Sequence, residues 1–424
     1  MTETERAIQA VWKIESAKLI ASLTRIVRDV GLAEELAQDA LVAALAQWPT
    51  EGVPRNPAAW LMSATKNRAI NLLRRGKMLE RKHAELAYEA DAEQEDILAN
   101  LEAKLDDQLG DDLLRLMFTA CHPLLSSEGR IALTLRLLGG LTTDEIARAF
   151  LTSEPTIAQR IVRAKRTLAE AQVPFEVPRG AELGQRLASV LEVIYLIFNE
   201  GYSATAGEDL LRPALCEEAL RLGRILAELS ADEAEVHGLL ALMALNASRT
   251  PARTLASGEP VLLTEQDRSL WDQALVRQGL AALTRAEALG GAPGPYVLQA
   301  GISACHARAP TSEETDWRRI AELYGELSSL LRSPVVELNR AVAVSMAEGP
   351  AAGLSLIDAL SALPSLQNYH LLPSARADLL SKLGRLAEAQ AEFERAAKLT
   401  RNARQRERLL MRAEGCAQAA AKKS

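Results

Sequence analysis

Hydrophobic and polar positions alternate with a helical period along most of the chain. Near the N-terminus, apolar residues recur three and four positions apart over residues 5–28, over residues 32–48 and from residue 56 onward, which predicts three amphipathic helices. Pro49 is expected to end the second of them. Further segments with this period lie beyond residue 174, at about 182–198, 211–228, 232–247, 264–289, 295–307, 317–331, 335–348, 350–362, 375–383 and 386–399. Aromatic residues make up only 4% of a chain rich in Ala and Leu, so the predicted fold class is all-α.

Residues 141–168 contain the pattern that says most about function. Thr142 and Glu145 make a capping box at the start of one short helix, and Ser153 caps a second helix after a tight turn. The side expected to be buried holds Ile146, Ala147, Phe150, Ile157, Ile161 and Leu168. The other side of the second helix carries Thr156, Gln159, Arg160, Arg163, Lys165 and Arg166. This predicts a helix-turn-helix whose second helix enters the major groove of DNA, with an amphipathic hairpin bearing a solvated basic face as the alternative.

The polar side chains of this second helix divide by the DNA groups that they suit. The amide of Gln159 and the guanidinium of Arg160 match the hydrogen-bonding edges of bases, so we expect them to read sequence. Arg163 and Lys165 are better suited to phosphate groups, which position a protein on DNA without reporting the sequence.

The third N-terminal helix has a face rich in amide and basic side chains. Its members are Lys66, Asn67, Arg68, Asn71, Arg74 and Arg75. Such groups are suited to hold a separated DNA strand and an unstacked base. Trp60 lies on the opposite, apolar face, so we expect it to be a core residue and not a stacking platform for bases.

The net charge of −7 is unusual for a DNA-binding chain, but the acidic residues are unevenly distributed. Between Glu85 and Asp112 there are eleven acidic residues and a single base, Lys104. The segments on either side are basic, and local patches, not total charge, govern binding to nucleic acid. We therefore expect residues 84–110 to form an acidic linker, which is either a solvated tether or a nascent amphipathic helix.

Three motifs in this part of the chain resemble the two conserved domains of a bacterial sigma-70 family factor of the extracytoplasmic-function type. They are AEELAQDALVAAL at 33–45, NPAAWLMSATKNRAINLLRR at 56–75 and SEPTIAQRIVRAKRTL at 153–168. The resemblance covers most of residues 1–172, and the acidic linker separates the second motif from the third. Leu41 departs from the family pattern, which usually places an aromatic residue there, and weaker packing is expected at that position.

The resemblance implies a role for each motif. Glu35, Gln38 and Asp39 would lie on the helix that binds the coiled coil of the β′ subunit of core RNA polymerase, whose β and β′ subunits and promoter DNA are the expected partners. The third helix would recognise and melt the −10 promoter element. The helix-turn-helix would read the −35 element.

The C-terminal part contains a repeat. ARADLLSKLGRLAEAQAEFERAAKL at 375–399 has the tetratricopeptide pattern, with Leu383-Gly384 in the turn and Ala389 and Phe393 in the second helix. NRAVAVSMAEGPAAGLSLIDAL at 339–360 looks like a degenerate copy, with Gly349 and Gly353 at roughly corresponding positions. Stacked pairs of this kind form a concave face that binds a protein or peptide ligand. This part also resembles the extension of a sigma subgroup that has a tetratricopeptide-like domain in place of a partnered anti-sigma factor.

The remaining chemistry points away from catalysis. The sequence has no phosphate loop, nucleophile elbow or metal-ligand spacing, so we expect no enzymatic activity, no metal and no cofactor. Cys121, Cys216, Cys305 and Cys416 are far apart, which is typical of reduced core cysteines. The first residues lack the apolar core of a signal peptide and no apolar run reaches the length of a membrane span, so a cytoplasmic location without membrane contact is expected. Residues 199–202 and 266–268 are the candidates for a functional surface in the C-terminal half.

The predicted organisation has four parts: a region 2 domain at 1–83, the linker at 84–110, a region 4 domain at 111–173 and a C-terminal helical-repeat domain at 180–424. The leading hypothesis is a sigma factor that its own extension regulates, either by masking the DNA-binding surfaces or by supporting polymerase binding. The alternative is a helical-repeat adaptor or DNA-binding regulator whose helix-turn-helix merely resembles that of a sigma factor.

Overall fold

The computed structural model describes residues 3–83, 109–150, 152–202, 212–255, 261–400 and 403–421. The regular elements of these ranges are helices, which confirms the predicted all-α fold class. Contacts divide the chain into two compact units, Met1–Leu196 and Ile197–Ser424. None of the helices in the described ranges has the length and apolar character needed to cross a bilayer.

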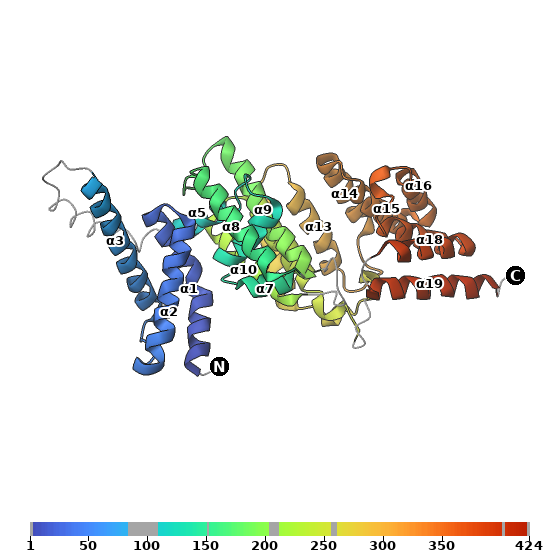
Figure 1. Ribbon diagram of the computed structural model, residues 1–424. Coiled ribbons are helices and arrows are strands. Elements are labelled where there is room, and N and C mark those ends of the chain that lie inside the picture. The colour runs from blue at the N-terminus through green and yellow to red at the C-terminus, as the bar shows by residue number, and fades with distance from the viewer. Residues whose placement is uncertain are drawn as a thin grey trace. The chain divides into compact units, whose positions relative to one another are not determined.

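The first unit begins with three helices that pack on one another, α1 (Glu3–Val27), α2 (Val30–Glu51) and α3 (Pro57–His83) (Figure 1). Leu23 of α1, Ala37 of α2 and Leu61 of α3 are almost fully buried. Small side chains on α2 let the helix backbones approach closely. The unit continues with α5 (Leu109–Ala120), α6 (Ser127–Leu137), α7 (Thr143–Ala149), α8 (Glu154–Glu170) and the first part of α9 (Ala181–Tyr202).

Both ends of α2 follow from local chemistry. The Asp29 carboxylate caps its start by accepting a hydrogen bond from the Leu32 amide at 2.8 Å. The predicted end at Pro49 is wrong, because Pro49 lies inside the last turn and the helix continues to Glu51. Gly52 ends it with a φ of 87°, and its amide donates to the Trp48 carbonyl at 3.0 Å. A proline in the last turn removes one donor, and this helix tolerates that loss.

The first part of α9 is built into the first unit by polar contacts. The Ser189 hydroxyl donates to the Cys121 carbonyl at 2.6 Å, and the Arg186 guanidinium donates to the Phe118 carbonyl at 3.1 Å. Arg130 of α6 binds both Ser189 and Glu192 of α9, at 2.6 and 2.9 Å. The compact unit therefore extends past residue 173 and includes α9 as far as Leu196.

The second unit is a succession of helical hairpins. After the end of α9 it contains α10 (Pro213–Leu229), α11 (Ala234–Ala247), η1 (Thr250–Ala252), η2 (Leu263–Glu265), η3 (Arg268–Leu270), α12 (Gln273–Ala288), α13 (Pro295–Arg308), α14 (Trp317–Leu331), α15 (Pro334–Glu348), α16 (Pro350–Leu360), η4 (Pro364–Leu366), α17 (Leu371–Lys382), α18 (Leu386–Leu399) and α19 (Ala403–Ala421). Neighbouring helices from α13 to α19 pack in chain order (Figure 1).

Two expectations for this unit were wrong. The predicted helix at 264–289 begins only at Gln273, because the Asp272 carboxylate caps that point by accepting from the amides of Ala274 and Leu275 at 2.8 and 3.1 Å. The residues before it form two short 3-10 turns. In addition, α19 was not predicted at all.

The two predicted repeat pairs correspond to α15–α16 and α17–α18. Gly349 lies in the turn between α15 and α16, and Gly384 lies in the turn between α17 and α18. Their φ angles are 105° and 78°, in the region that favours glycine. Phe393 and Ala389 of α18 are buried in the hydrophobic core that the repeats share. Gly353 lies where α16 presses on α15, and a Cβ atom there would come within 2.4 Å of the Ser345 Cβ and 2.7 Å of the Ala341 carbonyl oxygen.

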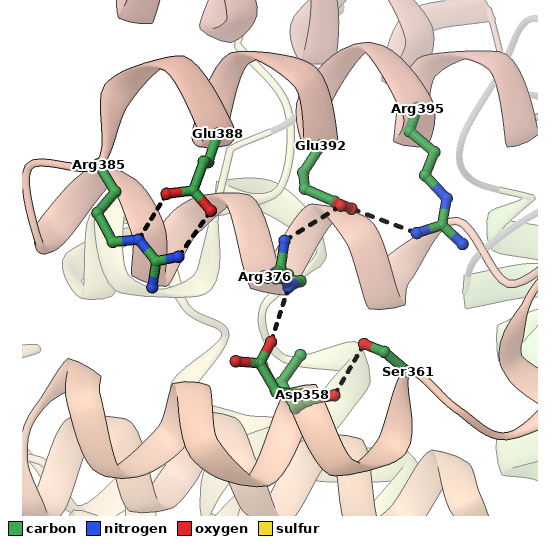
Figure 2. Close-up of polar contacts among 8 residues, drawn as sticks. Asp358, Ser361, Arg376, Arg385, Glu388, Glu392 and Arg395 are labelled. Carbon is green, nitrogen blue, oxygen red and sulfur yellow. Dashed lines mark hydrogen bonds and ion pairs between the residues drawn. The ribbon is translucent and has the colours of Figure 1, made fainter.

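An ionic ladder crosses the same helices at their surface (Figure 2). Arg376 of α17 lies between Asp358 of α16 and Glu392 of α18, at 2.8 and 3.2 Å. Arg395 extends the ladder by pairing with Glu392 at 3.5 Å. Because Arg376 pairs with carboxylates on both neighbouring helices, it links three helices that also share an apolar core.

We predict that Gly353→Ala destabilises the second unit by about 1–3 kcal/mol, because the new methyl group meets backbone and side-chain atoms of α15. Gly325→Ala in α14 is the matched control, since a Cβ atom at Gly325 meets nothing within 4 Å. Alanine is a better helix former than glycine, so the control should keep or raise the melting temperature. Thermal unfolding followed by circular dichroism measures both. Equal melting temperatures for the two variants would contradict the close packing of α16 on α15.

Candidate nucleic-acid interface

The helix-turn-helix forms as the sequence predicts. Thr142 and Glu145 make the complete capping box of α7, with the Glu145 amide donating to the Thr142 hydroxyl at 3.1 Å and the Thr142 amide donating to the Glu145 carboxylate at 2.7 Å. The Ser153 hydroxyl caps α8 by accepting from the Thr156 amide at 3.3 Å. The buried residues of α8 are Ile157, Ile161, Ala164 and Leu168. These contacts orient α8 so that its opposite side faces solvent.

The outward side of α8 is polar and basic. Gln159, Arg163 and Arg166 are exposed, and Thr156 and Arg160 are half-buried. Arg166 pairs with Glu170 at 3.1 Å, but both side chains are largely exposed, so the pair is weak. Within the described residues no ion pair involves Arg160 or Arg163. The first two turns therefore present amide and guanidinium donors, which are the groups that read base edges and bind phosphate.

Lys165 is placed differently from the other predicted contacts. Its ammonium group forms an ion pair with the carboxylate of Glu34 on α2, and its side chain is 22% exposed. The sequence pattern predicts Glu34 on the polar face of α2 with Glu35, Gln38 and Asp39, but Glu34 is 3% exposed. Its Oε1 also accepts hydrogen bonds from Arg136 Nε and from Gln38 Nε2, each at 2.6 Å.

The charge of Glu34 is therefore well compensated. Burial alone would raise the pKa of Glu34, but the ion pairs with Lys165 and Arg136 outweigh it and hold the pKa below its usual value. The carboxylate is consequently ionised at neutral pH.

A second buried carboxylate, Asp112 at the start of α5, pairs with Arg25 of α1 and Arg115 at 2.9 and 2.7 Å. Burial raises the pKa of Asp112, and its two cations offset this only in part.

The predicted polymerase-binding residues lie on one side of α2. Glu35 and Asp39 are exposed, whereas Gln38 is half-buried against Glu34. The same side shows Val42 and Leu45 with 63% and 44% of their surface exposed. The helical spacing of apolar residues predicts Leu45 on the buried face of this helix with Leu36, Ala40 and Leu41, and for Leu45 that prediction is wrong. Exposed apolar side chains beside carboxylates are typical of a surface that binds another protein.

The predicted −10 residues lie on α3. Asn67 is exposed, and Lys66 and Arg68 are half-buried. Asn71, Arg74 and Arg75 belong to the helix, but their side chains lie outside the described residues, as do residues 84–108 of the predicted linker.

Trp60 packs near the start of α3. Its ring meets that of Trp48 edge to face, with the centroids 5.4 Å apart. The side chain is half-buried, so Trp60 packs against α2 but is not the fully buried core residue that the sequence predicted.

The candidate surface of the C-terminal half is a cation–π cluster. Arg253 lies 3.7 Å above the Tyr202 ring, and Arg249 and Arg268 lie 6.0 and 5.2 Å from the Trp271 ring. Arg268 also donates to the carbonyls of His306 and Ala309 at 2.9 and 2.5 Å and to the Thr315 hydroxyl at 2.8 Å. These bonds tie η3 to α13 and to the turn before α14, which is a structural role.

The cysteines lack the features of reactive thiols. All four are free, and Cys121, Cys216 and Cys416 are buried. Burial raises the pKa of the Cys121 thiol to about 11 and that of the Cys216 thiol to about 12. In the part of the chain that the structure describes, no group of three or more His, Cys, Asp and Glu side chains is arranged to hold a metal ion.

Comparison with known proteins finds three families along the chain. Residues 15–78 match the family described as Sigma-70 region 2, residues 115–168 match Sigma-70, region 4, and residues 186–287 match a family of unknown function (DUF6596). An uncharacterized protein of Rhizobium meliloti (strain 1021) is 44% identical over 392 residues, which span 91% of this chain and 90% of that protein. Among solved structures, yeast Tom70 aligns with 99% of this chain and 85% of its own, at 13% identity and a TM-score of 0.38.

Proposed function

The chain belongs to the sigma-70 family, whose members act in transcription initiation. From this membership we propose which partner each surface of the protein binds. The protein joins core RNA polymerase, reads two promoter elements and opens DNA without catalysing a reaction. The observation that carries this proposal is the outward face of α8, where a capped helix-turn-helix presents Gln159, Arg160 and Arg163 to solvent.

In this proposal α8 reads the −35 element. Gln159 and Arg160 contact base edges from the first two turns, while Thr156, Arg163 and Arg166 contact phosphates. Lys165 joins the phosphate contacts once it leaves Glu34. The third helix, α3, holds the −10 element through Lys66, Asn67, Arg68, Asn71, Arg74 and Arg75, whose amide and cationic groups suit a separated strand.

The polymerase-binding surface is the outward side of α2. Glu35 and Asp39 supply charge, and Val42 and Leu45 supply apolar surface that a partner would cover. A partner that fits this surface would offer basic and apolar side chains, and in our proposal this partner is the coiled coil of the β′ subunit. The protein works where core polymerase is, in the cytoplasm.

The C-terminal unit regulates this activity in our proposal. It consists of stacked helical hairpins, including two tetratricopeptide-like pairs, and arrays of this kind bind protein or peptide ligands on their concave face. Such a ligand would control whether the unit masks the DNA-binding surfaces or supports polymerase binding.

Within this proposal, a first prediction concerns Arg163→Ala, which removes one phosphate contact. Affinity for DNA should fall about equally for all sequences, and the slope of log K against log salt should become shallower by about 0.9. Fluorescence anisotropy over a salt series measures the slope. Arg148→Ala on α7 is the control, because Arg148 is exposed on the neighbouring helix and pairs with Asp144. An unchanged slope would remove Arg163 from the interface.

A second prediction separates base reading from phosphate binding. Arg160→Ala should reduce discrimination among −35 variants by about 1–3 kcal/mol, because a bidentate base contact is lost. Run-off transcription with purified core polymerase on a set of −35 variants gives the discrimination. If the variant ranks them as the wild-type protein does, Arg160 does not read bases.

A third prediction concerns α2. Asp39→Arg should weaken binding to core polymerase about tenfold or more, since it puts a like charge against a basic partner surface. Glu51→Arg, at the exposed end of the same helix, should leave the affinity near that of the wild-type protein. Copurification and surface plasmon resonance measure both. The absence of any polymerase binding by the wild-type protein would instead favour an adaptor.

Regulation by the C-terminal unit can be tested by comparing the full chain with a chain truncated after Tyr202. This truncation leaves α9 intact, which matters because Arg186 and Ser189 bind α5 and the following turn. Transcription by the purified N-terminal fragment should rise if the C-terminal unit masks and fall if it supports. Unchanged transcription would contradict regulation.

A further inference from the structure

Three arginines gather around two aromatic rings in the second unit. Arg253 lies 3.7 Å above the Tyr202 ring, and Arg268 lies 5.2 Å from the Trp271 ring. Arg249 is within reach of both rings, at 5.9 and 6.0 Å. Tyr202 ends α9, whereas the arginines flank η1 and begin η3, so the fold brings these cations together from separate segments.

The acceptors that these arginines use are neutral. The guanidinium of Arg249 donates to the side-chain oxygen of Asn246, and that of Arg253 donates to the Tyr202 carbonyl. That of Arg268 donates to two backbone carbonyls and a hydroxyl. Among the residues that the structure describes, no carboxylate forms an ion pair with any of the three. Charges removed from water are normally paired, so a cluster of three cations with neutral partners is suited to bind an anion.

The three positive charges act on one another. Burial lowers the pKa of Arg253 and that of Arg268, and repulsion from Arg249 contributes to both shifts. Tyr202 opposes this at Arg253, and Glu313 opposes it at Arg268 from beyond ion-pair distance. A guanidinium nevertheless keeps its proton at neutral pH. The cluster is therefore a local concentration of positive charge inside a chain whose net charge is −7.

Several donor atoms of the cluster are buried without an acceptor. Within the described residues, the Nε atoms of Arg249 and Arg268 and the Nε1 atom of Trp271 have no hydrogen-bond partner. Arg249 and Trp271 are 9% and 4% exposed. Buried N–H groups almost always have an acceptor, and the three atoms are all donors. The group that would complete them is therefore an acceptor.

Phosphate fits this set of donors better than a carboxylate does. A guanidinium binds an oxyanion through two parallel hydrogen bonds. A phosphate monoester carries a charge of about −1.5 to −2 at pH 7 and three acceptor oxygens, so it can bind more than one guanidinium. A carboxylate brings one charge and two oxygens. Arg253 and Arg268 are half-buried, so the cluster borders the surface, where a small ligand has access.

We propose that the three arginines form a binding site for a phosphate group, either the free ion or part of a small molecule. Arg249 and Arg253 bind the phosphate oxygens, and Trp271 adds a neutral donor. Arg268 is held by its bonds to α13 and to the turn before α14, and it contributes charge. Because Arg253 donates to the Tyr202 carbonyl, the site is joined to the last turn of α9, a helix whose earlier part belongs to the first unit.

The test is titration of the full chain with inorganic phosphate at constant ionic strength. Isothermal titration calorimetry should show one site per chain with a Kd on the order of 1 mM or below. Arg249→Gln should weaken binding by about tenfold or more, because a charge-assisted contact is lost. Arg277→Gln is the matched control, since it removes an exposed cation of α12 in the same unit, and it should bind as the wild-type protein does.

Two further probes identify the source of the phosphate group. Glycerol 3-phosphate should bind more tightly than inorganic phosphate if the ligand is an ester, and less tightly if it is the free ion. Both results support the site. Acetate at the same concentration should bind at least about tenfold more weakly than phosphate, and equal affinities would contradict a site built for more than one negative charge.

Thermal unfolding separates a ligand site from a purely structural cluster. Phosphate should raise the melting temperatures of the wild-type protein and of Arg277→Gln by the same amount, and that of Arg249→Gln by less. General stabilisation by phosphate would act on all three proteins equally. If Arg249→Gln fails to fold, Arg253→Gln replaces it with the same expectations, because the Arg253 side chain is only half-buried.

Two results would overturn the proposal. One is the absence of phosphate binding by the wild-type protein, and the other is equal binding by the wild-type protein and a folded Arg249→Gln. Neither measurement needs polymerase or promoter DNA. The phosphate site and the proposed role in transcription can therefore fail separately.

Discussion

A carboxylate removed from water must be compensated by nearby cations, and Glu34 meets this requirement with groups from another part of the chain. Breaking such a pair by removing one partner costs about 3–5 kcal/mol, because the remaining charge is buried alone. The ion pairs of Glu34 therefore hold α2 beside α8 as part of the folded structure. A residue of the helix proposed to bind polymerase is thus at the same time a structural partner of the helix-turn-helix.

Apolar burial and ion pairs both stabilise the first unit. The first unit contains two modules, α1–α3 and α5–α8; Leu23 and Ala37 are buried in the first and Ile157 and Ile161 in the second, and α1 also packs against α5. The contacts between the modules include the ion pairs of Glu34 and Asp112. Salt screens buried ion pairs much less than exposed ones, so these contacts are expected to persist as the ionic strength rises.

Local sequence patterns predicted the helices well, because capping and periodicity are local properties. Thr142, Glu145 and Ser153 make the bonds that their spacing indicates. Errors in burial arose where a distant partner decides. Glu34 looks like a surface residue until Arg136, about a hundred positions away, is placed beside it. Asp112 likewise counted as part of an acidic stretch, yet it pairs with Arg25.

The thiols have a consequence for how the protein tolerates oxidants. A thiol reacts as the thiolate, and with pKa values of about 11 and 12 Cys121 and Cys216 carry almost none at neutral pH. Both cysteines are also buried among packed helices, and the Ser189 hydroxyl donates a hydrogen bond to the Cys121 carbonyl. Oxidation of these two sulfurs by peroxide would therefore require local unfolding.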